Sequence, residues 1–269
     1  YFSAAGNQAQ RSYESVFRDS GETFTANGIT YRLHDFDPGA GVDSTQLMSQ
    51  TGSVIYDLQW AQSFFSASGV GGNSDLALIF RQTNGTVITI IDSNNINADA
   101  LELAQLNGNG SFTLSIGVDP VGTNPTFIKY VTFGGTWSAS EYATNSSTSF
   151  GHSNAAGAIG VAAADWFNTP AFGQSPPLGE NFTSRGGQQI YFDTDGNALA
   201  TPETRTTVDI TMADGGNNTF FGSDISSDLD TLPNFYGTSA AAPNAAAIAA
   251  LLLQAAPNAT PAQIQAALE

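Results

Sequence analysis

The feature that most constrains this sequence is a serine placed between a Gly-Thr pair and a long run of small apolar residues. Gly237 and Thr238 precede Ser239, and an uncharged run rich in alanine and leucine follows over residues 245–256. This run predicts a buried helix. Ser239 would lie at its N-terminus, where unpaired backbone N–H groups and the helix dipole favour developing negative charge. Acyl-transfer enzymes use such a position for a nucleophile.

Two details of this stretch depend on how the helix begins. We expect Pro243 in the first helical turn, where no intrahelical N–H donor is needed. A purely structural interpretation makes Ser239 the N-cap of the helix, a position at which serine is common. The residues around Ser239 alone leave a nucleophile and an N-cap about equally supported.

The same stretch resembles the nucleophile motif of subtilisin-like serine peptidases, usually Gly-Thr-Ser-x-Ala-x-Pro before an apolar helix. The family commonly has histidine after the proline, where this chain has Asn244, a position outside the catalytic set. Residues 4–7, Ala-Ala-Gly-Asn, resemble the motif whose asparagine donates to the oxyanion, although Gly-Asn is also a common turn. The resemblance implies that Ser239 is the nucleophile and Asn7 an oxyanion-hole donor.

Further segments resemble this family in the family's order. Residues 158–163 resemble a core strand, and residues 181–186, Asn-Phe-Thr-Ser-Arg-Gly, resemble the Asn-Phe-Ser-Ser-Arg-Gly loop. Residues 207–210 and 213–215 resemble the next strand and a loop in which proline and glycine are frequent. The resemblance covers residues 1–10 and 150–269 and implies an α/β fold with a mostly parallel sheet, incomplete in this chain.

Residues 11–149 have a different pattern, with short β-branched and aromatic runs separated by turns. Asn84-Gly85 lies between two apolar runs and predicts a hairpin. We expect an antiparallel β-sandwich inserted into the subtilisin-like fold, similar to the small modules of secreted bacterial peptidases. The predicted strands cover residues 23–33, 53–60, 75–81, 87–91, 111–118 and 127–133.

The charge of the chain limits its partners. There are 24 acidic and 7 basic residues, for a net charge of −17. This disfavours nucleic acid and anionic membranes as partners and suits a secreted or cell-surface protein, which we expect to be bacterial. The chain has no cysteine, so it has neither a disulfide nor a thiolate-metal site. We also expect no uncharged run to approach membrane-spanning length.

A serine nucleophile of this family needs a general base and a residue that orients it. The family's aspartate and histidine precede the oxyanion asparagine, but neither residue occurs before Asn7. His34 and His152 both follow Asn7, and the family order makes neither of them the base. We therefore expect the C-terminal part of a peptidase domain, inactive alone, whose Asp and His lie upstream. A base at His152 in an altered arrangement is a further interpretation.

The other class of function is a non-catalytic binding or adhesion protein on a degenerate peptidase scaffold, with the inserted module binding protein or glycan. The peptidase interpretation implies a protein or peptide substrate. An incomplete sheet would leave surfaces of the sheet or of a helix exposed, through which the chain could dimerise.

Two polar clusters could bind a metal. His34, Asp35, Asp37 and Asp43 follow a predicted strand, but a Pro-Gly pair between them favours a solvated loop. The segment 193–197 has the alternating oxygen ligands Asp193, Asp195 and Asn197 of a calcium loop but no distal glutamate, so we prefer a hairpin turn. We expect no cofactor, with a structural calcium ion as the one candidate. Near the end, residues 260–263 predict a capping box and a last short helix.

Overall fold

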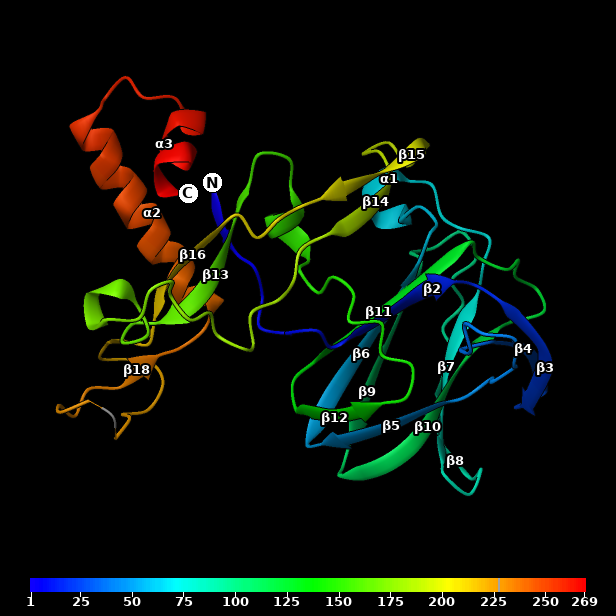
Figure 1. The fold of residues 1–269 in the computed structure, drawn as a ribbon. Helices are drawn as coiled ribbons and strands as arrows, with labels where there is room; N and C mark the ends of the chain where they lie inside the picture. The colour runs from blue at the N-terminus through cyan, green and yellow to red at the C-terminus, as the bar shows by residue number, and fades with distance from the viewer. Residues whose placement is uncertain (227) are drawn as a thin grey trace. The chain divides into compact units, whose positions relative to one another are not determined.

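The computed structural model describes residues 1–226 and 228–269, which form two compact units (Figure 1). The first unit comprises Tyr1–Gln10, Ser147–Gln189 and Thr204–Glu269. The second comprises Arg11–Ser146 and Ile190–Glu203. The second unit thus includes a segment late in the chain, within the region that resembles the peptidase family. Nothing in the local sequence of that segment indicates where it packs.

A three-stranded parallel sheet forms the centre of the first unit. Its order is β1 (Phe2–Ala4), β13 (Ile159–Asp165) and β16 (Ile210–Asp214), with both pairings parallel. All seven residues of β13 are buried, as expected for a central parallel strand covered on both faces. Because parallel strands end at the same edge of a sheet, the residues that follow β1, β13 and β16 gather at one edge. The first unit also contains η1 (Gly151–Asn154), η2 (Pro170–Phe172), β17 (Gly216–Asn217) and β18 (Asn234–Phe235).

Helix α2 (Thr238–Ala255) lies against this sheet (Figure 1). It packs on the sheet through alanine side chains. Ala241 and Ala245 are fully buried against β13 and β16, because methyl side chains allow the helix to approach the sheet closely. Pro243 is the sixth residue of α2 and lies outside the first turn, contrary to the sequence prediction. Since proline has no N–H, the carbonyl group of Ser239 receives no i+4 hydrogen bond from it.

The prediction that this helix is buried is wrong for its second half. Ile248, Leu251 and Leu253 are 40%, 64% and 45% exposed, whereas the buried residues of α2 end at Ala249. The expectation that no segment approaches membrane-spanning length is also wrong, because α2 is long and apolar enough by length and composition. Most buried residues of α2 lie in its first half, which packs in the core of the first unit.

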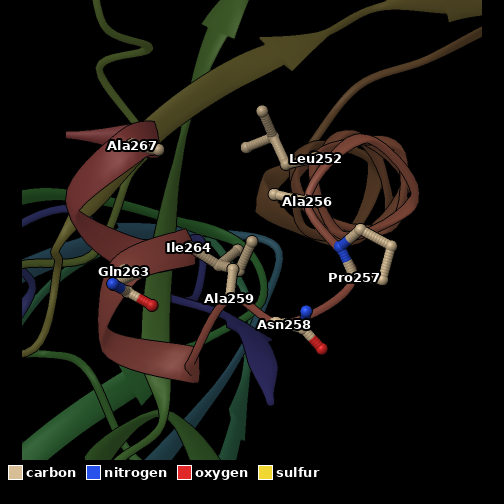
Figure 2. Close-up of a pocket in the computed structure, with 8 residues that line it drawn as sticks. All are labelled: Leu252, Ala256, Pro257, Asn258, Ala259, Gln263, Ile264 and Ala267. Carbon is tan, nitrogen blue, oxygen red and sulfur yellow. The ribbon is translucent and has the colours of Figure 1, made fainter.

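Helix α3 (Pro261–Leu268) follows α2 and begins as the sequence predicts. Thr260 accepts a hydrogen bond from the backbone N–H of Gln263, and the Gln263 side chain accepts one from Thr260, which completes the capping box. An open hollow lies between the two helices (Figure 2). Leu252 and Ile264 line it, about 20 Å along α2 from its N-terminus, given a rise of 1.5 Å per residue.

The second unit consists mainly of two sheets, and every strand pair described in them is antiparallel. The larger sheet contains β3 (Asp19–Ala26), β4 (Ile29–His34), β5 (Gln46–Thr51), β7 (Leu76–Gln82), β8 (Val87–Ile91), β10 (Gly110–Val118) and β12 (Thr136–Ser140). The smaller sheet contains β2 (Ser12–Val16), β6 (Ser53–Trp60), β9 (Leu101–Asn107) and β11 (Phe127–Phe133). The unit also includes α1 (Phe65–Ser68) and most of the paired strands β14 (Gln188–Phe192) and β15 (Ala198–Arg205).

One hydrophobic core joins these two sheets. Tyr56 and Tyr130 of the smaller sheet belong to the same buried cluster as Phe80 and Leu114 of the larger one. Inward-facing and outward-facing side chains alternate along β6, which is why its sequence predicts a strand. Each predicted run contains a strand, and the run 23–33 is divided into β3 and β4 at Asn27-Gly28. Asn84-Gly85 does connect β7 to β8, whereas β2, β5, β9 and β12 were not predicted.

Candidate active site

Ser239 is the second residue of α2 and is exposed to solvent. The N-cap position belongs to Gly237, so the interpretation of Ser239 as the N-cap is wrong. Gly237 has φ of +129° and ψ of 157°, a backbone conformation that residues with a side chain rarely adopt. The strained turn therefore requires glycine, and it presents the serine hydroxyl group at the positive end of the helix.

Asn7 is held next to this turn by Thr238. Oδ1 of Asn7 accepts hydrogen bonds from the backbone N–H of Thr238 at 3.0 Å and from its hydroxyl group at 2.9 Å. These two bonds fix the orientation of the amide, because Oδ1 can only accept and Nδ2 can only donate. Nδ2 would lie 3.2 Å from a Cβ atom placed on Gly237, so a side chain there would crowd the amide donor.

The turn that carries Asn7 is held in place by the loop at residues 181–186. The backbone N–H of Ser184 donates to the carbonyl oxygen of Gly6 at 2.8 Å, and the Ser184 hydroxyl group accepts from the N–H of Gln8 at 3.0 Å. The N–H of Gly6 donates to Oγ1 of Thr238 at 3.1 Å. The three segments that resemble the peptidase family thus meet at the carboxyl edge of the parallel sheet.

A group of carboxyl groups lies at the same edge. Asp165 ends β13 and Asp214 ends β16, and the two residues are paired in register. Oδ2 of Asp214 accepts a hydrogen bond from the backbone N–H of Gly237 at 2.7 Å. Burial raises the pKa of Asp165, Asp214 and Glu180, and the charge of Asp165 raises that of Asp214 further. Burial and the nearby Asp165 raise the pKa of Tyr236 to about 12.

Neither histidine of the chain has the environment of a general base for Ser239. His152 lies in η1, and its ring packs edge-on against Tyr1 at 6.2 Å between centroids. Tyr1 precedes β1 and pairs with the start of β13, at the amino edge of the sheet. The length of β13 therefore separates His152 from Ser239, about 20 Å at 3.3 Å per residue.

His34 is fully buried in the core of the second unit. Its Nδ1 accepts from the backbone N–H of Arg18 at 3.2 Å, and its Nε2 lies 2.8 Å from the hydroxyl group of Tyr13. Burial lowers the pKa of His34 to about 3, and the charge of Arg18 adds to this effect. The ring is therefore neutral at pH 7, and both of its nitrogen atoms are already hydrogen-bonded.

The carboxyl groups near His34 organise a loop. Oδ1 of Asp35 accepts from the backbone N–H groups of Asp37 and Asp43, and the side chain of Asp35 is largely buried. The interpretation of this segment as a solvated loop is wrong for His34 and Asp35, which are buried.

The segment Asp193–Asn197 connects β14 to β15, as the preferred interpretation predicts. Oδ1 of Asp193 accepts from the backbone N–H groups of Asp195 and Asn197, so this carboxylate closes the turn. Calcium binding at Asp193, Asp195 and Asn197 stays a prediction. The sequence analysis missed another carboxyl group cluster, Asp224, Asp228 and Asp230, whose candidate ligand atoms lie within 4.8 Å of one another.

Comparison with known families gives a match that includes part of this site. The model of the subtilase family matches residues 108–269, which is more than half of the chain and includes Ser239. The chain belongs to the subtilase family. A comparison with curated proteins found no match. The family match does not include Asn7, whose assignment depends on its contacts with Thr238 and on the motif that it ends.

The sequence analysis missed several residues of this subtilase site. Thr238 was recognised only as part of a motif, yet it is the residue that orients Asn7. Asp165 and Asp214 were also missed, although each ends an apolar run that becomes a parallel strand. A carboxylate that ends each of two such runs was the signal available, because parallel strands bring such residues to one edge. Asn244 was left without a role, and its side chain donates to the carbonyl oxygen of Ala213 at 2.9 Å.

Proposed function

We propose that this chain is the Ser239-bearing part of a subtilisin-like serine endopeptidase, which cleaves peptide bonds through an acyl-enzyme. Ser239 would attack the carbonyl carbon of the scissile bond, and Nδ2 of Asn7 would donate to the oxyanion that forms. The observation that carries this proposal is the pair of bonds from Thr238 to Oδ1 of Asn7. They leave the amide donor, not the acceptor, free to bind the oxyanion near the N-terminus of α2.

We propose that the general base and its orienting aspartate come from polypeptide outside this sequence, upstream of Asn7 in the parent protein. Neither histidine of the chain is placed to activate Ser239. His34 is buried in the core of the second unit, and His152 lies at the amino edge of the parallel sheet. A serine without a base is a weak nucleophile, so this chain alone should be inactive.

We propose that the second unit is an antiparallel β-sandwich inserted into the peptidase domain, which agrees with its two antiparallel sheets and common core. The acidic composition supports a secreted or cell-surface location, without nucleic acid or anionic membrane as partner. The peptidase proposal itself implies a protein or peptide substrate. The exposed apolar residues on α2, Ile248, Leu251 and Leu253, are the surface through which we would expect a dimer to form.

The proposal is tested by labelling the purified chain with a serine-directed fluorophosphonate, beside Ser239→Ala. The matched control is Ser223→Ala, which removes another exposed serine of the first unit. We expect no labelling of the chain alone. When the upstream sequence is restored, we expect labelling at Ser239 and peptide hydrolysis, both lost in Ser239→Ala and retained in Ser223→Ala.

A folded, processed longer protein that neither labels nor hydrolyses peptides would overturn the proposal. Labelling of the chain alone at Ser239 would show that a base lies within these residues, and His152→Gln and His34→Gln would then be compared.

The second candidate is a binding or adhesion protein on a degenerate peptidase scaffold. The observation in its favour is that neither histidine of this chain is placed to activate Ser239. The parent sequence separates the two candidates, because a natural absence of both an upstream aspartate and an upstream histidine would favour the binding protein.

A further inference from the structure

We propose that Asp214 is a positioning residue of this site, whose carboxylate holds the Gly237 peptide and thereby the turn that carries Ser239. The effect on catalysis rests on the proposed function. The contact itself can be measured without any enzymatic activity.

The hydrogen bond between Asp214 and Gly237 is short and buried. Asp214 is 1% exposed, and its Oδ2 lies 2.7 Å from the Gly237 nitrogen. A bond from N–H to an ionised carboxylate is stronger than a bond between neutral groups. Oδ1 of Asp214 is buried without a hydrogen-bond partner among the described residues. Such a carboxylate costs desolvation free energy, which the bond to Gly237 partly offsets.

The conformation of Gly237 determines where the next residues of the site lie. Because glycine has no side chain, only its backbone groups can hold this conformation. The φ of +129° at Gly237 depends on contacts made by its backbone groups, among them the bond from its N–H to Asp214, and the next two residues are Thr238 and Ser239. Thr238 in turn orients the amide of Asn7. A rotation of the Gly237 peptide would therefore displace both the nucleophile and the oxyanion donor.

Other titratable groups face this contact from each neighbouring element. Asp165 faces Asp214 from β13, Glu180 lies in the loop after η2, and Tyr236 precedes Gly237 in the turn. Burial and the charge of Asp165 both favour the protonated form of Asp214. A protonated carboxyl group is a weaker acceptor, so the bond to Gly237 should weaken as the pH falls through the pKa of Asp214.

Selective labelling makes this bond visible, since Tyr236-Gly237 is the only Tyr-Gly pair in the sequence. A chain with ¹³C-carbonyl tyrosine and ¹⁵N-glycine gives one correlated amide signal, that of Gly237. We expect its proton to resonate downfield at pH 8 and to move upfield as acid is added. In Asp214→Asn the Gly237 amide proton should resonate upfield already at pH 8 and should not move as acid is added. In Asp165→Asn the Gly237 signal should move upfield as in the unmodified chain, but at lower pH. Removal of the negative charge of Asp165 lowers the pKa of Asp214.

A Gly237 signal that does not move with pH in the folded chain would overturn the inference, as would an unchanged titration in Asp214→Asn. If that variant does not fold, Asp165→Asn is combined with Glu180→Gln, because Asp165 also raises the pKa of Glu180. A signal that still titrates, at lower pH, in this double variant supports Asp214, and a signal that no longer titrates contradicts it. In an active longer protein, Asp214→Asn should lower kcat about tenfold with little change in KM. A titrating signal without serine labelling would contradict the proposed function alone, and labelling without the titration would contradict this inference alone.

Discussion

Thr238 donates both its backbone N–H and its hydroxyl group to the same atom, Oδ1 of Asn7, at 3.0 and 2.9 Å. The Thr238 hydroxyl oxygen also accepts from the N–H of Gly6 at 3.1 Å. One fully buried side chain therefore connects the start of α2 to the turn after β1, which is more than two hundred residues earlier in the chain. Asn7, the proposed oxyanion donor, is positioned by this threonine and by backbone groups.

Substitutions of Thr238 should distinguish the effect of its hydroxyl group from the effect of its side-chain shape. Thr238→Val keeps the volume and the N–H but removes the hydroxyl group, and we expect a loss of about 1 kcal/mol in the free energy of unfolding of the first unit. In an active longer protein, kcat should fall about tenfold, because the amide of Asn7 is less well oriented. Urea unfolding and steady-state kinetics check this. Thr238→Ser should retain both properties, and equal effects of valine and serine would contradict the role of the hydroxyl group.

Replacing Asn7 tests the donor itself. Asn7→Asp keeps an oxygen acceptor for Thr238 but removes the N–H donor, so kcat in an active protein should fall by roughly 10²–10³ with KM little changed. The free energy of unfolding should change by less than the activation free energy of the reaction, because Asn7 is exposed. Asn244→Asp is the matched control, since the Asn244 amide donates to Ala213 and not to the oxyanion. An equal loss of activity in both variants would argue against an oxyanion role for Asn7.

The sequence predicted those parts of the fold that local pattern determines. The strand β6 alternates inward-facing and outward-facing residues, and the hairpin from β7 to β8 has an Asn-Gly turn, so both could be located. Ser239 and Asn7 could be paired because short motifs kept the order typical of one family. These features depend on neighbours in sequence, or on a resemblance, and not on distant contacts.

What could not be predicted depends on tertiary contacts. The composition of α2 is uniformly apolar, so it does not reveal that Ala245 is buried and Leu251 exposed. The burial of His34 follows from its contact with Tyr13, twenty-one residues away, and not from the polar residues next to it. The bond from Gly237 to Asp214 likewise requires the end of β16 to lie beside the start of α2.

The buried His34 should make the second unit less stable in acid. Its pKa is about 3 in the folded chain, below the 6.5 of an unfolded one, so the unfolded state binds more protons between these values. The contribution of His34 to stability, present above pH 6.5, is therefore lost as the pH falls, by about 3 kcal/mol between pH 7 and 4.5. Native-state hydrogen exchange of β6 and β11 amides measures this. Relative to the unmodified chain, His34→Gln should gain stability as the pH falls from 7 to 4.5, and the exposed His152→Gln should not.

Glu102, in the same unit, should have the opposite effect on the pH dependence of stability. Burial raises its pKa to about 7, although hydrogen bonds from Ser93 oppose this, so the folded state binds more protons between pH 4.5 and 7. The stability that Glu102 contributes is present below pH 4.5 and is lost as the pH rises through 7. Since Glu102 is 1% exposed, the loss should approach about 3 kcal/mol.

Glu102→Gln removes this titration and keeps an oxygen that can accept from the Ser93 N–H. The hydrogen-exchange stability of β9 in this variant should therefore rise, relative to the unmodified chain, between pH 5 and 8. Asp195→Asn is the matched control, because Asp195 is an exposed acid of the same unit. If both variants change the profile equally, net charge and not the buried Glu102 determines it. Between pH 4.5 and 6.5 the contributions of Glu102 and His34 change in opposite directions and largely cancel in the unmodified chain. Each single variant should therefore reveal the slope of the other group, and the variant that combines Glu102→Gln with His34→Gln should show neither slope.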